Sequence, residues 1–293
     1  MHGVEFAILL HRALEARVQE LNDASAGEGG FSDPAVVHRA RVACRRLLAL
    51  MKLLDDEAYP HCKGRSKALR DFAKELGAVR DLDVQIAGLG DLHASTAQAI
   101  HQAALEYVLE NVTRRRQKRL ETLNIKVPSF ARLLKVSSLS NPFEGSSVTV
   151  EAWACLQPCI TGALSRISTL KEQEDIKKLH ESRIQVKRLR DTMEALAPAF
   201  PAEPTGFLME LRAMQTALGD HHDQAALEIL LRKNLDHLTE AGRSALSKNL
   251  LVVLDIVVNA RRKAFERFQS LEGPWDDIEF SARVQALLGV NTV

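Results

Sequence analysis

The sequence predicts an all-α fold made of two antiparallel helical bundles, and three observations lead to that prediction. Apolar side chains recur every three or four residues along most of the chain. Sustained alternation of apolar and polar residues, which marks a half-buried strand, is confined to Ser147–Val150. One block of the first half also returns in the second half at a fixed offset. Since 46% of the 293 residues are hydrophobic, the helices have enough apolar surface for a core.

The first half begins with strong helix signals. A helix is predicted to start at Asp33-Pro34, because Asp caps a first turn and Pro is tolerated in it. The Gly-rich segment before it is predicted to be a loop. Pro128 is predicted to interrupt the chain, with a short helix over 130–134 after it. Helices of this half are predicted over 4–21, 34–55, 63–79, from about 82, and 95–123.

The clearest break in the chain is the stretch SSLSNPFEGSS at 137–147, which is predicted to be a linker because Ser, Gly, Asn and Pro disfavour helix. The first half therefore covers about residues 1–136, the linker 137–148 and the second half about 149–272. The two halves form one domain up to residue 275, and a tail over 273–293 contains a short helix near 280–288. Helices of the second half are predicted over 150–170, 171–196, 206–218, 224–238 and 240–269.

The composition excludes a protein that attracts polyanions through its overall charge. Lys and Arg total 39 against 38 Asp and Glu, so any such affinity depends on where the cations lie. The apolar run Leu250–Val258 is too short for a membrane span and contains Asp255. Because no secretory signal is visible either, we expect a cytoplasmic protein. The four cysteines are expected to be reduced, and the spacing of Cys155 and Cys159 matches no common zinc motif.

The internal repeat has a constant offset of 142 residues. The block HRARVACRRL, which starts at His38, aligns with HESRIQVKRL, which starts at His180. The same offset aligns the Leu-Gly pair at 76–77 with that at 218–219, and Asp81 with Asp223. Because separate blocks keep the offset without a gap, we interpret the chain as a duplicated helical unit.

The repeated block gathers cations on one helix face, within an arc of about 60° in each half. No acid lies three or four positions away within the first of these helices to compensate the charges. Two readings stay open, a solvated or ion-paired face and a surface for a polyanion, and repetition with a leading His favours the second. The first set is His38, Arg41, Arg45 and Lys52, with Arg46 to the side; the second is His180, Arg183 and Lys187, with Arg190 beside them.

Further cations gather in Asn111–Lys135 and near 261–267. Proteins that bind single-stranded nucleic acid interleave aromatic residues with basic ones, because bases stack on them. Here aromatic residues are 5% of the chain and scattered, and neither a Gly-rich phosphate loop nor a helix-turn-helix spacing is visible. A polymer of phosphate without bases therefore fits better than nucleic acid.

A second repeated motif, LGAVRDLD at 76–83 and LGDHHD at 218–223, has two readings. In the first, the Gly ends one helix and the Asp caps the next, or pairs with an Arg across the bundle. In the second, the motif supplies metal ligands. The first half lacks the His, whereas a duplicated metal site should keep its ligand types, so the structural reading is favoured. The candidate ligands are Asp81, Asp83, Asp220, His222 and Asp223.

In this order, HxxRxxxRRL, LGxxRDLD, HxxRxxxKRLR and LGDHHD resemble the CHAD domain, the conserved histidine α-helical domain. The resemblance extends from about residue 4 to the region of Trp275. It implies two four-helix bundles related by a pseudo-twofold axis, with a basic groove between them that binds inorganic polyphosphate. It also implies a non-enzymatic module without a cofactor, associated with polyphosphate granules in the cytoplasm.

The resemblance assigns the ligands by position, in one row for each half. His38, Arg41, Arg45 and Arg46 form the first row, and His180, Arg183, Lys187 and Arg188 the second. Arg70, Lys74, Arg212, Arg115, Lys118 and Arg119 are additional candidates, with Lys52 and Arg190 from the helical wheel. Three positions depart from the pattern: Ser129 replaces an Arg before Phe130, Thr216 stands opposite Lys74, and Leu48 opposite Arg190.

The expected mechanism is electrostatic capture of the polyanion, with counterion release. The two leading histidines add charge when protonated, so binding is expected to strengthen below about pH 6.5. No membrane and no specific nucleic acid are expected as partners. Two alternatives are a metal-dependent phosphohydrolase that acts on polyphosphate through the second motif, and a helical scaffold whose basic face binds an acidic protein.

Overall fold

The computed structural model describes residues 2–25, 30–51, 62–131, 147–271 and 275–290, and all structural statements concern these. Within them every regular element is a helix, which confirms the all-α prediction. The first half contains α1 (His2–Ser25), η1 (Gly30–Ser32), α2 (Pro34–Met51), α3 (Cys62–Ser95) and α4 (Ala99–Ala131). The second half contains α5 (Val148–Leu164), α6 (Ile167–Glu172), α7 (Ile176–Leu196), η3 (Ala197–Ala199), α8 (Thr205–Glu240), α9 (Ser244–Gln269) and α10 (Asp277–Leu288).

The predicted helix ends at the second motif are wrong. Gly77 lies inside α3 and Gly219 inside α8, and both helices continue without interruption. The left-handed conformation that ends many helices at Gly occurs in the described residues only at Gly30, Gly242 and Gly289. A Gly inside a helix costs about 1 kcal/mol relative to Ala, and the long packed faces of α3 and α8 outweigh that cost.

A cap confirms one predicted helix start, and two other caps correct predicted starts. The amide of Ala35 donates to Asp33 Oδ1 at 2.8 Å, as the Asp33-Pro34 signal predicted. Ser147 is not the start of an extended segment; its Oγ accepts from the Val150 amide at 3.3 Å and begins α5. Asp175 caps α7 in the same way, so the helix predicted over 171–196 starts at residue 176.

Other helix boundaries differ from the prediction. The helix predicted over 150–170 is divided into α5 and α6, and α4 continues through Pro128 to residue 131. The helix predicted near 280–288 is α10, which starts at residue 277. The predicted helix end near residue 55, most of the helix over 130–134 and the linker up to residue 146 lie outside the described residues.

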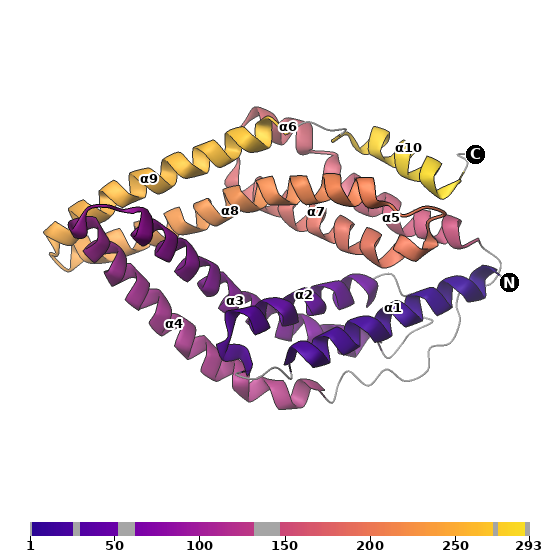
Figure 1. Cartoon of the computed structure of the whole chain (residues 1–293), viewed down its shortest axis with the longest axis horizontal. Coiled ribbons are helices and arrows are strands. Elements are labelled where there is room, and N and C mark those ends of the chain that lie inside the picture. The colour runs from indigo at the N-terminus through magenta and orange to yellow at the C-terminus, as the bar shows by residue number, and fades with distance from the viewer. Residues whose placement is uncertain (1, 26–29, 52–61, 132–146, 272–274, 291–293) are drawn as a thin grey trace.

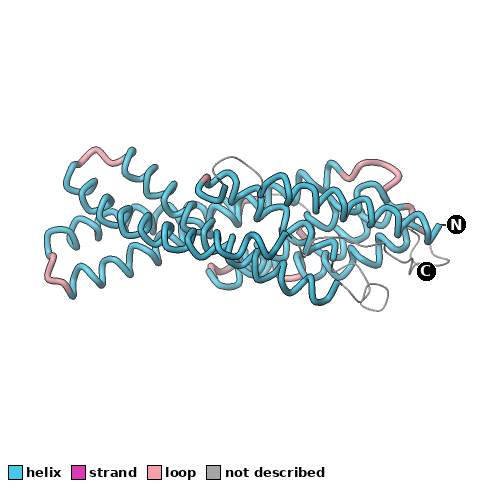
Figure 2. Tube along the Cα trace, turned by 90° about the horizontal axis from the view of Figure 1, so that it is seen from below, coloured by secondary structure: helices cyan, strands magenta, loops and turns pink. Residues whose placement is uncertain are grey.

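The two halves lie beside each other and meet at both ends of an elongated molecule (Figures 1 and 2). The antiparallel pairs α3/α4 and α8/α9 extend to one end, where their tips pack together (Figure 1). At the other end α1 and α2 contact α5 and α7. The buried apolar side chains form two cores, and each core draws on both halves. The halves are therefore not separate hydrophobic units.

Close packing also joins α3 to α8 between these ends. A Cβ atom at Gly88 of α3 would lie 2.9 Å from Leu227 Cδ1 of α8, which is closer than a real Cβ contact. The absence of a side chain at Gly88 lets the two long helices approach here. None of the helices that the structure describes combines the length and apolar character of a membrane span.

The helix bounds agree with the internal offset. Adding 142 to the bounds of α2 gives 176–193, and α7 spans Ile176–Leu196. The same shift of α3 gives 204–237, and α8 spans Thr205–Glu240. This agreement supports the duplication, which stays a prediction.

Candidate anion-binding site

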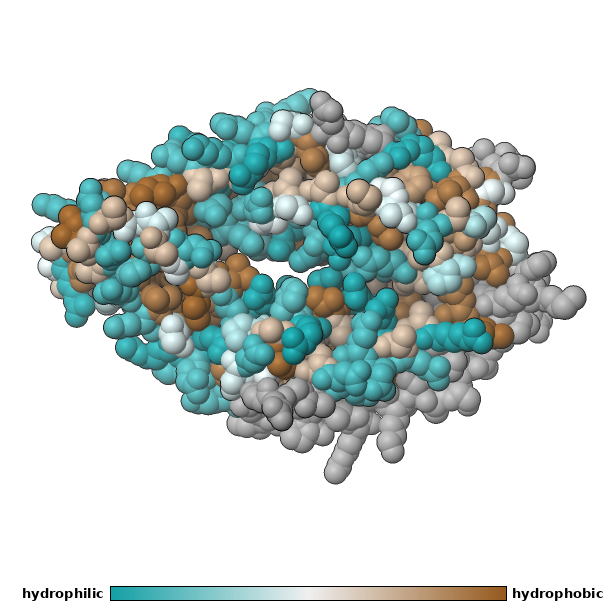
Figure 3. All heavy atoms as spheres, in the orientation of Figure 1, coloured by the Kyte–Doolittle hydropathy of each residue, from teal (hydrophilic) through white to brown (hydrophobic). Residues whose placement is uncertain are grey.

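An opening passes between the two halves near the middle of the molecule, and its rim is mostly hydrophilic (Figure 3). It lies between α2 and α3 on one side and α7 and α8 on the other (Figures 1 and 3). These four helices carry the two repeated motifs. The tertiary structure thus brings both copies of each motif into one region.

The glycine of each second motif makes room for the arginine of the first. Arg41 Nε lies 3.6 Å from the position that a Cβ would take at Gly77. In the other half, Arg183 Nε lies 3.8 Å from the corresponding position at Gly219. Each guanidinium therefore lies across the backbone of a long helix, and a bulky side chain in place of the glycine would displace it.

Three of the predicted cations are half-buried without an anionic partner. Among the described residues, Arg41, Arg183 and Lys187 form no hydrogen bond and no ion pair within 4.0 Å, and Arg183 Nε is buried and unsatisfied. Burial, and then the charges of Arg183, Arg45 and Arg41, lower the pKa of Lys187 to about 7. Burial also lowers the pKa values of Arg41 and Arg183. We name Arg41, Arg45, Arg80, Arg183 and Lys187 the central cation cluster.

The histidines beside this cluster are held neutral. His180 Nδ1 and His222 Nδ1 are 3.0 Å apart, so one ring donates to the other. Burial, with the charges of Arg183 and His180, lowers the pKa of His222 to about 3. Burial also lowers the pKa values of His38 and His180. The histidines therefore titrate below pH 6.5, and the expected strengthening of binding through them shifts to lower pH.

Two acids accompany the cluster without neutralising it. Neither Asp81 nor Asp223 forms an ion pair within 4.0 Å with a described residue. The charge of Asp81 acts on Arg41, and that of Asp223 on Arg183. Burial raises the pKa of Asp223, although Arg183 opposes the shift. The cations outnumber these acids, so the region keeps a positive charge that an anion can compensate.

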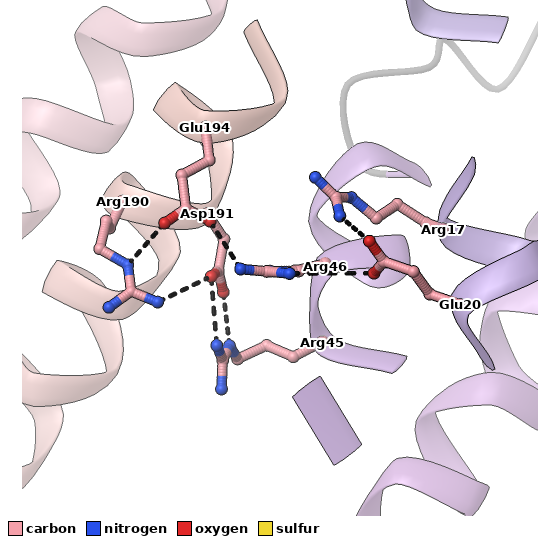
Figure 4. A network of polar contacts seen from close by, with 7 residues as sticks. All are labelled: Arg17, Glu20, Arg45, Arg46, Arg190, Asp191 and Glu194. Carbon is pink, nitrogen blue, oxygen red and sulfur yellow. Dashed lines mark hydrogen bonds and ion pairs between the residues drawn. The ribbon is translucent and has the colours of Figure 1, made fainter. Parts of the chain in front are cut away.

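Arg45, Arg46 and Arg190 belong to an ion-pair network that joins the halves (Figure 4). Arg45 of α2 donates from Nε to Asp191 Oδ2 at 2.5 Å and from Nη2 to Oδ1 at 3.2 Å. The Asp191 side chain is fully buried. Arg46 donates to Glu194 at 3.1 Å and also approaches Glu20 of α1, while Arg190 pairs with Glu194 at 3.2 Å. Arg46 thus links α2 to α7, Arg190 pairs within α7, and only Arg45 of the three also contributes charge to the central cation cluster.

The remaining predicted ligands lie outside the cluster. The seven that the structure describes are exposed, and none of them is among the charges that shift the pKa values of the cluster. Arg212 lines a separate surface groove of about 530 Å³ with Thr216 and Arg267. Lys52 lies outside the described residues. The exposed set is Arg70, Lys74, Arg115, Lys118, Arg119, Arg188 and Arg212.

Sequence reasoning missed Arg80 and the role of His222 at this site. The charge of Arg80 lowers the pKa of His38. At the equivalent place in the other half, His222 contacts His180. The internal offset of 142 residues could have predicted both, because it aligns residue 80 with residue 222. The interpretation of the nearby glycines as helix ends hid it, since it placed both residues in a turn.

The five candidate metal ligands do not come together. Asp83 accepts from Arg116 Nε at 2.5 Å, Asp220 pairs with Arg267 at 3.5 Å, and His222 contacts His180. Within the described ranges, no three His, Cys, Asp or Glu side chains are placed to hold a metal ion. The described cysteines, Cys44, Cys155 and Cys159, are free thiols.

Comparison with known proteins identifies the family. The family model of the CHAD domain matches residues 12–232. The crystal structure of the CHAD domain from the plant Ricinus communis is similar, with a TM-score of 0.54 and 22% identity over 100% of this chain and 93% of that one. PptA from Streptomyces chartreusis is similar with a TM-score of 0.61 and 17% identity over 90% and 97% of the two chains. A search of curated proteins gives no match. Motifs, fold and family model agree, and the chain belongs to the CHAD domain family.

Proposed function

We propose that this protein binds inorganic polyphosphate, without hydrolysing it, through the central cation cluster. One observation carries the proposal: Arg41, Arg183 and Lys187 are half-buried cations, and none of them forms an ion pair within 4.0 Å with an acidic side chain of the described residues. An unpaired buried charge destabilises a fold, so its presence in both halves favours an external anion. Membership of the CHAD domain family supports phosphate polymer as that anion.

The chemistry of the cluster suits a phosphate chain. Arginine forks bind phosphate oxygens through two hydrogen bonds, and Lys187 adds a point charge when it is protonated. Neither α2 nor α7, which supply four of the five cations of the cluster, contains a Phe, Tyr or Trp on which bases would stack, and this favours polyphosphate over single-stranded nucleic acid. We further propose that the protein is cytoplasmic and associates with polyphosphate granules, where a fluorescent fusion should colocalise with them.

The test is titration with long-chain polyphosphate at several salt concentrations, with single-stranded DNA as competitor. If about five phosphates are neutralised, the slope of log K against log[salt] should be near −3 to −4. DNA should displace the polymer poorly. A slope near zero, or equal affinity for both polymers, would contradict the proposal.

A matched pair of variants locates the site. Arg41→Glu with Arg183→Glu should abolish binding, whereas Arg262→Glu with Lys263→Glu makes the same change in net charge on the exposed face of α9 and should bind. Circular dichroism checks that both variants are folded. Equal losses in the two variants would show that overall charge, not this site, binds the polymer. Release of phosphate by the unmutated protein, with or without Mg²⁺ or Mn²⁺, would contradict the non-enzymatic part of the proposal.

A further inference from the structure

The ammonium of Lys187 differs from its neighbours on α7 in both position and partners. It is half-buried, and it forms no hydrogen bond or ion pair within 4.0 Å with the described residues. Asp191, one turn along α7, is held by Arg45 through both carboxylate oxygens. Lys178, near the start of the same helix, is exposed and paired with Asp175 at 3.0 Å. Of these two lysines, only Lys187 has no ion-pair partner within 4.0 Å among the described residues.

The groups around Lys187 come from three helices and comprise three cations, two acids and three neutral histidines. They are Arg41, Arg45 and His38 from α2, Arg183, Asp191 and His180 from α7, and His222 and Asp223 from α8. Such a setting favours the neutral amine, whose nitrogen lone pair is a nucleophile. It also attracts small phosphorylated compounds, because Arg41 and Arg183 have unused donors.

We propose that Lys187 is a site of Nε-acylation by small acyl phosphates, and that acylation there weakens the anion site. The neutral amine attacks the carbonyl carbon of the acyl phosphate. The bond between that carbon and the phosphate oxygen breaks, and inorganic phosphate leaves with the electron pair. The nitrogen loses one proton to solvent, and an amide remains. No oxidant or reductant takes part.

Position and charge act together in this reaction. The guanidinium groups of Arg41 and Arg183 stabilise the charge of the departing phosphate, as donors in anion-binding sites do. With a pKa of about 7, about half of the Lys187 amine is neutral at pH 7, against roughly one part in a few thousand for an ordinary lysine. The product amide cannot be protonated near neutral pH, so the cluster loses the positive charge that Lys187 carries when protonated.

The experiment is incubation of the full-length protein with acetyl phosphate, followed by peptide mass spectrometry. Lys187 should react at least tenfold faster than Lys178 at pH 7, and this ratio should fall toward one near pH 10, where exposed lysines also lose their protons. Inorganic triphosphate should protect Lys187 and leave Lys178 unaffected. Equal rates at pH 7, or a ratio that does not change with pH, would overturn the proposal.

A neutral reagent separates nucleophilicity from phosphate capture. The preference for Lys187 over Lys178 should be larger with acetyl phosphate than with p-nitrophenyl acetate, which has no phosphate. Equal preferences would overturn the role of the arginines. Acetylated protein should also bind polyphosphate more weakly than untreated protein. Treatment with acetyl phosphate should not change the polyphosphate affinity of the Lys187→Arg variant. Unchanged binding by acetylated protein would overturn the proposal that acylation weakens the anion site.

This inference rests on the same anion site as the proposed function, but the two can fail separately. If the protein binds polyphosphate and Lys187 reacts no faster than Lys178, the acylation proposal is wrong and the binding proposal stands. If Lys187 reacts selectively and triphosphate protects it, but long-chain polyphosphate does not bind, the proposed function is wrong instead.

Discussion

Replacing Lys187 with Met should stabilise the fold and weaken polyphosphate binding. Met keeps much of the aliphatic length of Lys but has no charge to bury. Burial and the charges of Arg183, Arg45 and Arg41 lower the pKa of Lys187 from 10.5 to about 7. In the unfolded chain the ammonium returns to water and to its ordinary pKa. Folding therefore removes a proton from Lys187 or buries an uncompensated charge.

The pKa shift sets the size and the pH dependence of this effect. Each pKa unit corresponds to about 1.4 kcal/mol, so at pH 7 Lys187 lowers the free energy of unfolding by about 4 kcal/mol at most. Because the folded pKa is the lower one, this destabilisation fades as pH rises from about 7 toward 10.5. If Lys187→Met removes even a quarter of this destabilisation, about 1 kcal/mol, the Tm should rise by about 2 °C at pH 7.

The assay is thermal unfolding followed by circular dichroism at pH 7 and pH 10. Lys187→Met should have a higher Tm than the unmutated protein at pH 7, with a smaller difference at pH 10. Lys178→Met is the matched control, because Lys178 is exposed on the same helix, and its difference should stay near zero at both values. The reasoning is refuted if Lys187→Met has an equal or lower Tm at pH 7, or if its gain does not change with pH.

Three further predictions concern the helices, the contact between the halves and pH. The double variant Gly77→Ala with Gly219→Ala should have a slightly higher Tm and unchanged affinity for polyphosphate. A Cβ at these positions would lie 3.6 and 3.8 Å from the Nε atoms of Arg41 and Arg183, and each Ala favours helix over Gly by up to about 1 kcal/mol. A large loss of stability in thermal unfolding would restore the helix-end interpretation. Asp191→Asn should lower the free energy of unfolding in urea by about 3–5 kcal/mol, because it leaves Arg45 without its buried partner; a change below 1 kcal/mol would refute the structural role of the network. Polyphosphate affinity at constant salt should fall as pH rises from 6 to 8, because free Lys187 loses its proton near pH 7; affinity that rises over this range would contradict the site.

The sequence alone determined the all-α fold, the order of most helices and the residues of the two motifs. Helical periodicity and caps such as Asp33 are local properties, so they are visible without a structure. The offset of 142 residues also identified Arg41 with Arg183 as equivalent positions. In the folded chain the charge of Arg183 acts on Arg41.

Only the tertiary structure decided which cations form the site and which stabilise the fold. Arg45 and Arg46 are adjacent in sequence, yet Arg46 is bound by Glu194 and Glu20, while Arg45 also acts on the central cation cluster. Glu194 lies 148 positions from Arg46, and Asp191 lies 146 positions from Arg45, so no local pattern predicts these partners. Likewise, local preference predicts a helix end at Gly77, but α3 continues through it, and Arg41 Nε lies 3.6 Å from the position that a Cβ would take there. Long-range packing thus overrode local preference at the residues that define the site.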